Sequence, residues 1–102
     1  MSYESIKNYQ EQVVQDLMAI HAPRFPRIAR SEDLCADAAC IALNSLKARY
    51  FRHAVDLHFY MTDEERAVSW AAANAAVEAA LKYIDSRLYA ELLETERGSR
   101  YG

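Results

Sequence analysis

The stretch "RYFR" places two arginines around two aromatic rings. Arg49 and Arg52 flank Tyr50 and Phe51. The guanidinium group is a planar fork of donors that matches the geometry of a phosphate. Aromatic rings, in turn, stack on nucleic-acid bases. The combination therefore suits a ligand that carries both phosphates and bases, with Arg49 and Arg52 on phosphate and Tyr50 on a base.

A second stretch, "PRFPR", repeats the combination. Phe25 lies between Arg24 and Arg27, and Arg30 follows three residues later. We expect these arginines to form a second set of phosphate ligands and Phe25 a second stacking surface. The alternative is that the aromatic rings belong to the core and the arginines are merely solvated. From the residues alone, this simpler alternative is favoured.

The charge of the chain is unevenly distributed. The 15 acidic and 12 basic residues give a formal net charge of −3. Residues 22–53 hold six bases and three acids, a net charge of +3, whereas residues 62–97 hold four bases and eight acids, a net charge of −4. A basic segment can focus a local field even on an acidic protein. Direct DNA binding by this segment would weaken steeply with salt, and the net acidic charge argues against it.

Metal and enzymatic chemistry find little support. Cys35 and Cys40 are five residues apart, roughly 140° around a helix, so they do not share a face as paired zinc ligands would. The stretch "HAVDLH" offers His53, Asp56 and His58 at no recognised metal spacing. There is no Gly-rich phosphate loop and no nucleophile elbow. We expect reduced thiols, no metal, no cofactor and no enzymatic activity.

The elements that must position these residues are predicted to be helices. The chain has 102 residues, 52% of them hydrophobic, with only two Gly and two Pro, which favours one domain of long helices. Apolar spacings of three and four predict a first helix from Tyr3 to about His21, ended by Pro23. Ser31, as N-cap, begins a second helix that runs to about Ala48. This helix is apolar nearly all round, which is typical of a buried helix.

Two stretches are less regular. "APRFPRIARS", with two prolines, is predicted to be a surface connection between the first two helices. Within residues 49–60, Val55, Leu57 and Phe59 alternate with polar residues. This period of two predicts a short strand or an extended arm, with continued helix as the open alternative.

The last helix has the clearest beginning. Thr62 as N-cap and Glu65 at N3 form a capping box, and no Gly or Pro follows until Gly98. A helix of roughly 35 residues would be about 50 Å long, whereas a globule of this size is roughly 35 Å across. A second copy of the chain would cover the projecting end, so we expect a homodimer.

Together these patterns predict an all-α fold. It has three main helices, with an irregular or short extended segment before the long C-terminal helix. Residues 1–97 form a single domain, and residues 98–102 form a flexible tail. No apolar run approaches the roughly 20 residues of a membrane helix. The polar N-terminus lacks the apolar core of a secretory signal, so we expect a cytoplasmic protein with no membrane partner.

The run "DAACIALNSLKARY", from Asp37 to Tyr50, resembles the signature of the late competence development protein ComFB family. In that family an acidic residue precedes an "ALN-x-L" helix that leads to a tyrosine. The order of helices agrees over about residues 4–90. One branch of the family carries a cysteine cluster before this helix and binds zinc, but this sequence has only Cys35 there. It also has "LKARY" where the family often has "LPP-x-Y".

The resemblance implies a small, cytoplasmic, helical homodimer. Part of the family binds the cyclic dinucleotides c-di-GMP or c-di-AMP and links their level to competence, motility or cell-surface behaviour. The leading hypothesis is therefore a non-enzymatic, dimeric cyclic-dinucleotide receptor with an unknown downstream protein partner. Its ligand-binding residues would be Arg49, Arg52, Tyr50, Arg24, Arg27, Arg30 and Phe25.

The alternative is a dimeric protein-interaction adaptor without a nucleotide ligand. Its working surface would be an apolar stripe on the last helix, formed by Trp70, Val77, Leu81 and Leu88. Under either hypothesis we expect Asp37 and Asn44 to be structural, capping or bridging around the second helix.

Overall fold

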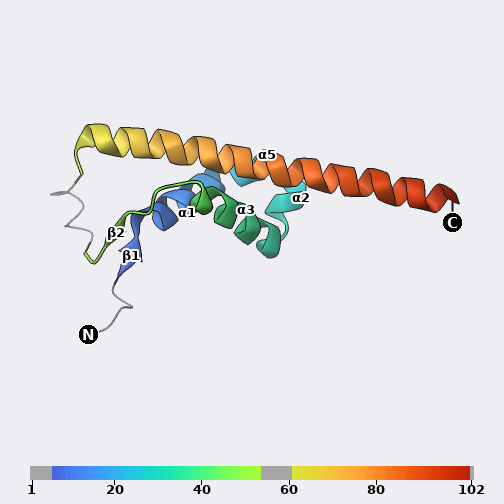
Figure 1. The fold of residues 1–102 in the computed structure, drawn as a ribbon, viewed down its shortest axis with the longest axis horizontal. Coiled ribbons are helices and arrows are strands. Elements are labelled where there is room, and N and C mark those ends of the chain that lie inside the picture. Colours follow the sequence, from blue (N-terminus) through green and yellow to red (C-terminus); the bar gives the residue numbers. More distant parts are fainter. Residues whose placement is uncertain (1–5, 54–60, 102) are drawn as a thin grey trace.

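A computed structural model describes residues 6–53 and 61–101, with side chains described as far as Thr95. One long helix forms a platform, and the other helices pack along one side of it (Figure 1). The predicted all-α fold with three main helices is confirmed. The described elements are β1 (Lys7–Asn8), α1 (Tyr9–His21), the 3₁₀ helix η2 (Ala22–Arg24), α2 (Pro26–Ala29), α3 (Glu32–Asn44), β2 (Tyr50–Phe51) and α5 (Asp63–Tyr101).

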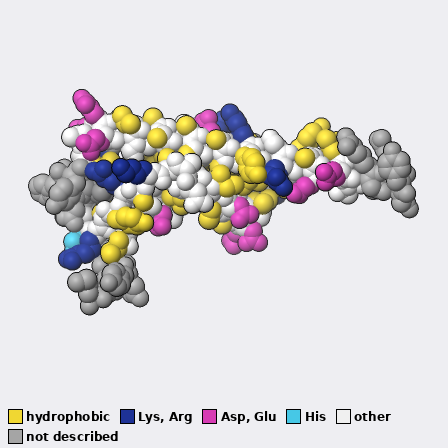
Figure 2. Space-filling view, in the orientation of Figure 1, with side chains coloured by type: hydrophobic (Ala, Val, Ile, Leu, Met, Phe, Trp, Pro, Cys, Tyr) yellow, Lys and Arg dark blue, Asp and Glu magenta, His cyan; other side chains and the backbone are white. Residues whose placement is uncertain are grey.

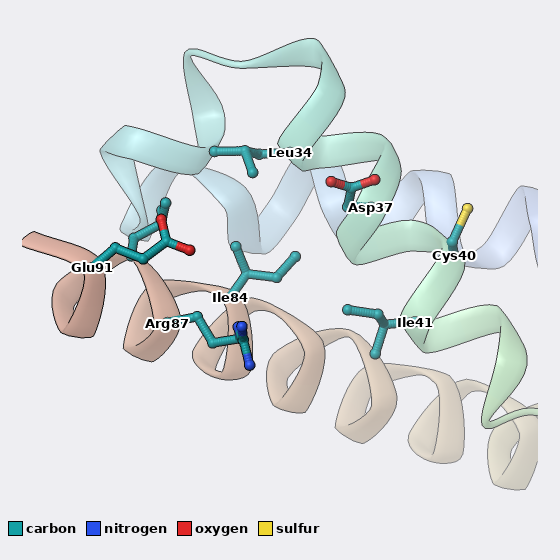
Figure 3. A pocket seen from close by; sticks show the side chains of 8 residues that line it. Leu34, Asp37, Cys40, Ile41, Ile84, Arg87 and Glu91 are labelled. Carbon is teal, nitrogen blue, oxygen red and sulfur yellow. The ribbon is translucent and has the colours of Figure 1, made fainter.

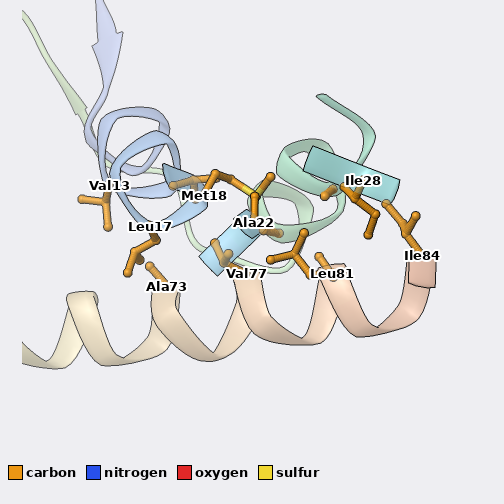
Figure 4. Close-up of a cluster of buried hydrophobic side chains, with 13 residues drawn as sticks. Val13, Leu17, Met18, Ala22, Ile28, Ala73, Val77, Leu81 and Ile84 are labelled. Carbon is orange, nitrogen blue, oxygen red and sulfur yellow. The ribbon is translucent and has the colours of Figure 1, made fainter. Parts of the chain in front are cut away.

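The core lies where α1, α2 and α3 meet the first two thirds of α5 (Figure 4). Alanines are buried in this core beside large side chains, and they let the helices approach closely. The buried large side chains include Leu17, Ile28, Val77 and Leu81. The fully buried alanines are Ala38, Ala42 and Ala73.

The N-terminal helix begins later than predicted. Residues 7 and 8 form β1, which pairs antiparallel with β2, Lys7 opposite Phe51 and Asn8 opposite Tyr50. Asn8 is also the N-cap of α1, since its Oδ1 accepts a hydrogen bond from the Gln10 N–H at 3.2 Å. A helix from Tyr3 is therefore wrong for residues 6–8, because strand pairing takes these residues instead. The end of the helix before Pro23 is confirmed.

The proline-containing stretch is more than a surface connection. It forms η2 and α2, and each helix has its proline at the first turn, where the missing N–H costs no hydrogen bond. Ile28 is fully buried and Ala22 nearly so. The prediction of a plain surface link is wrong because these two apolar side chains join the core.

The second predicted helix, α3, has the expected start but a different end. Ser31 Oγ accepts a hydrogen bond from the Leu34 N–H at 3.1 Å, which confirms the N-cap. The helix ends at Asn44, and the Ser45 N–H bonds back to Ala42 and Leu43 in a tighter turn. The helix is not buried all round, since only Ala38 and Ala42 are buried. Although α3 is apolar nearly all round, only one of its faces packs against the other described helices.

The exposure of α3 also places its polar residues. Asp37 and Asn44 are both exposed, so neither is a buried group that needs a bridging partner. Ile41 and Cys40 are exposed as well. The polar pair therefore lies on the outer side of α3 together with apolar neighbours.

The long helix α5 begins as predicted and projects from the body. Thr62 Oγ1 accepts a hydrogen bond from the Glu65 N–H at 3.0 Å, which confirms the N-cap. The helix has 39 residues and the chain is 62 Å long in its longest dimension, so the far end of α5 extends past α2 (Figure 1). The alternating residues 55–59 lie outside the described residues. None of the described helices combines the length and apolarity needed to cross a membrane.

Two valines of α5 offer a matched test of this core. Val77 is 0% exposed and Val68 is 71% exposed. We expect Val77→Ala to lower the free energy of unfolding by about 2 kcal/mol, from lost burial and a residual cavity. Val68→Ala should change it by less than about 0.5 kcal/mol. Urea denaturation followed by circular dichroism measures both, and equal losses would contradict the packing of α5 described above.

Candidate functional site

Arg24 and Arg27 are held against α5 by two of its carboxylates. Arg24 Nη2 lies 3.6 Å from Glu78 Oε1, and Arg27 Nη2 lies 3.2 Å from Asp85 Oδ1. Phe25 is partly buried against the core, and the Arg24 guanidinium carbon lies 5.7 Å from its ring centroid. The structure therefore uses this group to join η2 and α2 to α5.

His21 strengthens the same junction. Its Nε2 lies 2.6 Å from Asn74 Oδ1, and its Nδ1 lies 3.0 Å from Arg24 Nη2. Because the amide oxygen of Asn74 and the guanidinium of Arg24 have fixed roles, Nε2 donates and Nδ1 accepts. The donors of Arg24 thus already face His21 and Glu78. Arg30, at the C-cap of α2, is exposed.

Arg49, Tyr50 and Arg52 form a second group, in and around β2 beside the start of α5. Arg49 Nη2 lies 3.7 Å from Glu65 Oε2. Tyr50 is 70% exposed. Arg52 Nε donates to His53 Nε2 at 3.3 Å. This group combines two cations with an accessible aromatic ring, as the sequence predicted.

The two groups lie far apart in one chain. Their carboxylate partners on α5 are Glu65 for Arg49, and Glu78 and Asp85 for the other arginines. With a rise of about 1.5 Å and a turn of about 100° per residue, these partners are about 20 and 30 Å apart along α5 and on nearly opposite sides of it. Figure 2 shows the Lys and Arg side chains of one face as separate patches. The seven predicted residues therefore do not converge within one chain.

A pocket of about 700 Å³ opens beside Arg49. Its walls come from the start of α1, the segment after α3 and the first turns of α5. The volume lies in the range of about 300–1,000 Å³ that is usual for small-molecule sites. The polar side chains that line it are Gln10, Lys47, Arg49, Thr62, Glu64, Glu65 and Ser69. We call it the Arg49 pocket.

The start of α1 holds the segment that carries Arg49. Asn8 Oδ1 accepts a hydrogen bond from the Arg49 N–H at 2.8 Å, in addition to the one from Gln10. The Tyr9 N–H donates to the Arg49 carbonyl. Gln10 Nε2 donates to the Lys47 carbonyl at 3.1 Å. These hydrogen bonds fix the backbone of residues 47–49 against α1. Lys47 and Arg49, the two cations of the pocket, therefore extend from a fixed backbone.

The sequence predicted Arg49 but missed Gln10, Lys47, Glu64 and Ser69 as pocket residues. Lys47 and Glu64 carry no local signal, because solvated charges of this kind are common. Gln10 does carry one. It lies three residues before Val13 on the buried face of α1, and a polar residue on such a face needs a hydrogen-bond partner.

A second hollow, of about 430 Å³, lies between α3 and α5. Figure 3 shows Leu34 and Ile41 of α3 near Ile84 of α5, with Arg87 and Glu91 beside them. Asp37 and Cys40 lie at its α3 wall. We call it the α3–α5 groove. With one cation and two acids, it suits a phosphate less well than the Arg49 pocket does.

The described residues contain no group of three or more His, Cys, Asp or Glu that could hold a metal ion. Cys35 and Cys40 are free thiols. Two members of the "HAVDLH" set, Asp56 and His58, lie outside the described residues.

Comparison with models of protein families matches residues 7–88 to the model described as "Late competence development protein ComFB". The matched span covers about four fifths of the chain and includes both arginine groups and every residue of the Arg49 pocket. Neither the curated proteins nor the solved structures give a match.

The double role of Asn8 leads to a stability prediction. Asn8→Ala removes both the N-cap of α1 and the anchor of Arg49, so we expect the free energy of unfolding to fall by about 1 kcal/mol. Asn8→Asp keeps an acceptor oxygen and should stay near the parent value. Urea denaturation compares the two variants. An equal loss in both would mean that the acceptor oxygen is not what stabilises this junction.

Proposed function

Because the chain belongs to the late competence development protein ComFB family, we propose that it is a non-enzymatic cytoplasmic receptor for a cyclic dinucleotide, c-di-GMP or c-di-AMP, and that the ligand binds in the Arg49 pocket. The observation that carries the proposal is the presence of Arg49 and Lys47 in one pocket of about 700 Å³. Both side chains are cations that bind phosphate. The family resemblance of the sequence supports the class of ligand.

A phosphate can compete with the ion pair that Arg49 makes with Glu65. Its ion pair with Glu65 is long, at 3.7 Å, and both side chains are about half exposed. An exposed pair of this kind contributes only about 0–1 kcal/mol, so a phosphate competes with it readily. Lys47 supplies a second charge on the same anchored segment.

The rim of the pocket extends the proposed site. Tyr50 follows Arg49 in the chain and exposes most of its ring, so a base can stack on it without displacing core residues. Arg52 follows two residues later and adds a cation beside β2. Arg24, Arg27, Arg30 and Phe25 lie on the other side of α5, and we propose no contact between them and a ligand in the Arg49 pocket of the same chain.

We further propose that the protein is a homodimer formed through the projecting part of α5. Tyr89, Leu92 and Leu93 are 59%, 52% and 38% exposed there. At about 100° per residue these three side chains share one face of α5. If two copies of α5 cross antiparallel about a two-fold axis near residue 89, this apolar face of each copy meets the same face of the other.

Most of the apolar stripe that the adaptor hypothesis requires as a binding surface is buried. Val77 and Leu81, two of its four residues, are fully buried in the core, and Leu88 is partly buried against it. Only Trp70 is exposed, at 41%. A partner could reach the two buried side chains only by unfolding the domain, so the receptor is the better supported function.

The receptor proposal predicts which arginine contributes to cyclic-dinucleotide binding. We expect Arg49→Ala to weaken cyclic-dinucleotide binding by about tenfold or more, equivalent to about 1.4 kcal/mol. The helical circular dichroism spectrum should be unchanged, because the Asn8 contacts to residue 49 use backbone atoms. Isothermal titration calorimetry measures the affinity.

Arg27→Ala is the matched control for this experiment. Arg27 is also a half-exposed arginine paired with a carboxylate of α5, and its loss should change the affinity by less than about twofold, since it lies outside the pocket. The reverse pattern, with Arg27 essential and Arg49 neutral, would move the ligand to the other side of α5. No heat with either cyclic dinucleotide would contradict the receptor proposal.

The dimer proposal is tested by a charge placed on the projecting helix. Leu92→Glu should raise the dimer dissociation constant by about tenfold or more, because it places a carboxylate in an apolar contact. Ala71→Glu puts the same charge on an exposed position about 30 Å from Leu92 along α5 and should leave the dimer intact. Light scattering after size exclusion gives the mass of each. A parent protein that stays monomeric at high concentration would contradict the dimer, and a fully dimeric Leu92→Glu would place the interface elsewhere.

A further inference from the structure

Gln10 has a buried hydrogen-bond acceptor that its surroundings leave without a partner. The residue is 8% exposed, and its Nε2 donates to the Lys47 carbonyl at 3.1 Å and to Ser69 Oγ at 3.4 Å. Because a carbonyl oxygen only accepts, the amide nitrogen must face Lys47, which fixes the orientation of the amide. Among the described residues, Gln10 Oε1 then finds no hydrogen-bond donor. Such an oxygen costs about 1–3 kcal/mol.

The side of the pocket formed by α5 is also rich in acceptors. Glu64 and Glu65 both line it, and an ionised carboxylate can only accept hydrogen bonds. Glu65 is held by Arg49, whereas Glu64 is exposed at the first turn of α5. The Glu65 N–H at this helix end is already bonded to Thr62. The two cations and two carboxylates give the side chains of the pocket a net charge of zero. Such a pocket favours a ligand that offers hydrogen-bond donors as well as phosphates.

This pattern calls for a ligand that is anionic at one end and rich in donors at the other. The Watson–Crick edge of guanine carries two adjacent donors, N1–H and the N2 amino group, which a carboxylate can accept together. The same edge of adenine carries one amino donor beside N1, whose lone pair would face the carboxylate and repel it. Edge recognition by a bidentate pair discriminates between bases by about 1–3 kcal/mol in nucleic-acid complexes.

We infer that the Arg49 pocket selects guanine over adenine, with the Glu64 carboxylate accepting from N1–H and N2–H while Lys47 and Arg49 bind the phosphates. The inference rests on the proposed function and narrows its ligand to c-di-GMP. Gln10 lines the same pocket, and its buried Oε1 is a further acceptor without a donor among the described residues. An adenine base offers one donor where guanine offers two, and its N1 lone pair faces the carboxylate, so specificity arises from that difference.

Isothermal titration calorimetry on the full chain tests the inference, with c-di-GMP and c-di-AMP titrated separately. The parent protein should bind c-di-GMP about tenfold or more tightly than c-di-AMP. Glu64→Gln replaces one acceptor oxygen with a donor, so it should weaken c-di-GMP and leave c-di-AMP unchanged or stronger. The preference should then fall by about tenfold.

Asp63→Asn is the matched control, because it removes the same charge from the neighbouring first-turn position without touching the residues that line the pocket. It should leave the preference within about twofold of the parent value. Binding of both ligands without a preference for c-di-GMP, or a preference that survives Glu64→Gln, would overturn guanine selection and leave the receptor function standing. No binding of either ligand would overturn both.

Discussion

The helices α1, α2 and α3 all pack on the first two thirds of α5, and their packing on Val77, Leu81 and Ile84 holds every other feature in place. Alanines 38, 42, 73 and 80 make this contact close. A chain of this size buries only about two thirds of its surface, so little apolar area is spare. The far end of α5 extends past the other described helices (Figure 1), and Tyr89, Leu92 and Leu93 are exposed on this part of the helix.

The uneven charge of the sequence has an internal explanation. Arginines of the basic middle segment meet carboxylates of the acidic α5 at three points along its length. Opposite charges that are segregated in the sequence are therefore paired in space. Among the described residues, the basic segment is therefore not a continuous cationic surface (Figure 2). Of these three arginine–carboxylate distances, the one between Arg49 and Glu65 is the longest.

The Arg49 pocket arises where three chain segments end. The start of α1, the turn after α3 and the N-terminus of α5 each bring polar groups that a helix interior would not offer, because helix ends leave backbone groups unpaired and attract capping side chains. Asn8 and Gln10 satisfy the backbone of residues 47–49 from the side of α1. Lys47 and Arg49 line the same pocket as Glu64 and Glu65 of α5. A pocket with both signs of charge suits a ligand that has both phosphates and hydrogen-bond donors.

The sequence by itself determined the helical class, the N-caps at Ser31 and Thr62 and the end of α1 before Pro23. These features depend on neighbours within a few residues, so local propensity and capping chemistry decide them. The tertiary structure alone decided the rest. The pairing of β1 with β2 made the first helix begin at Tyr9, after Asn8. The packing of the helices left one face of α3 exposed, although its sequence is apolar nearly all round. It also buried Ile28 in a stretch that was predicted to be a surface connection. It also separated Arg24 and Arg27 from Arg49 by placing their partners on opposite sides of α5, and it brought Gln10 to Lys47 and Glu64. Contacts between residues so far apart in the chain follow from how the helices pack, which no local pattern in the sequence encodes.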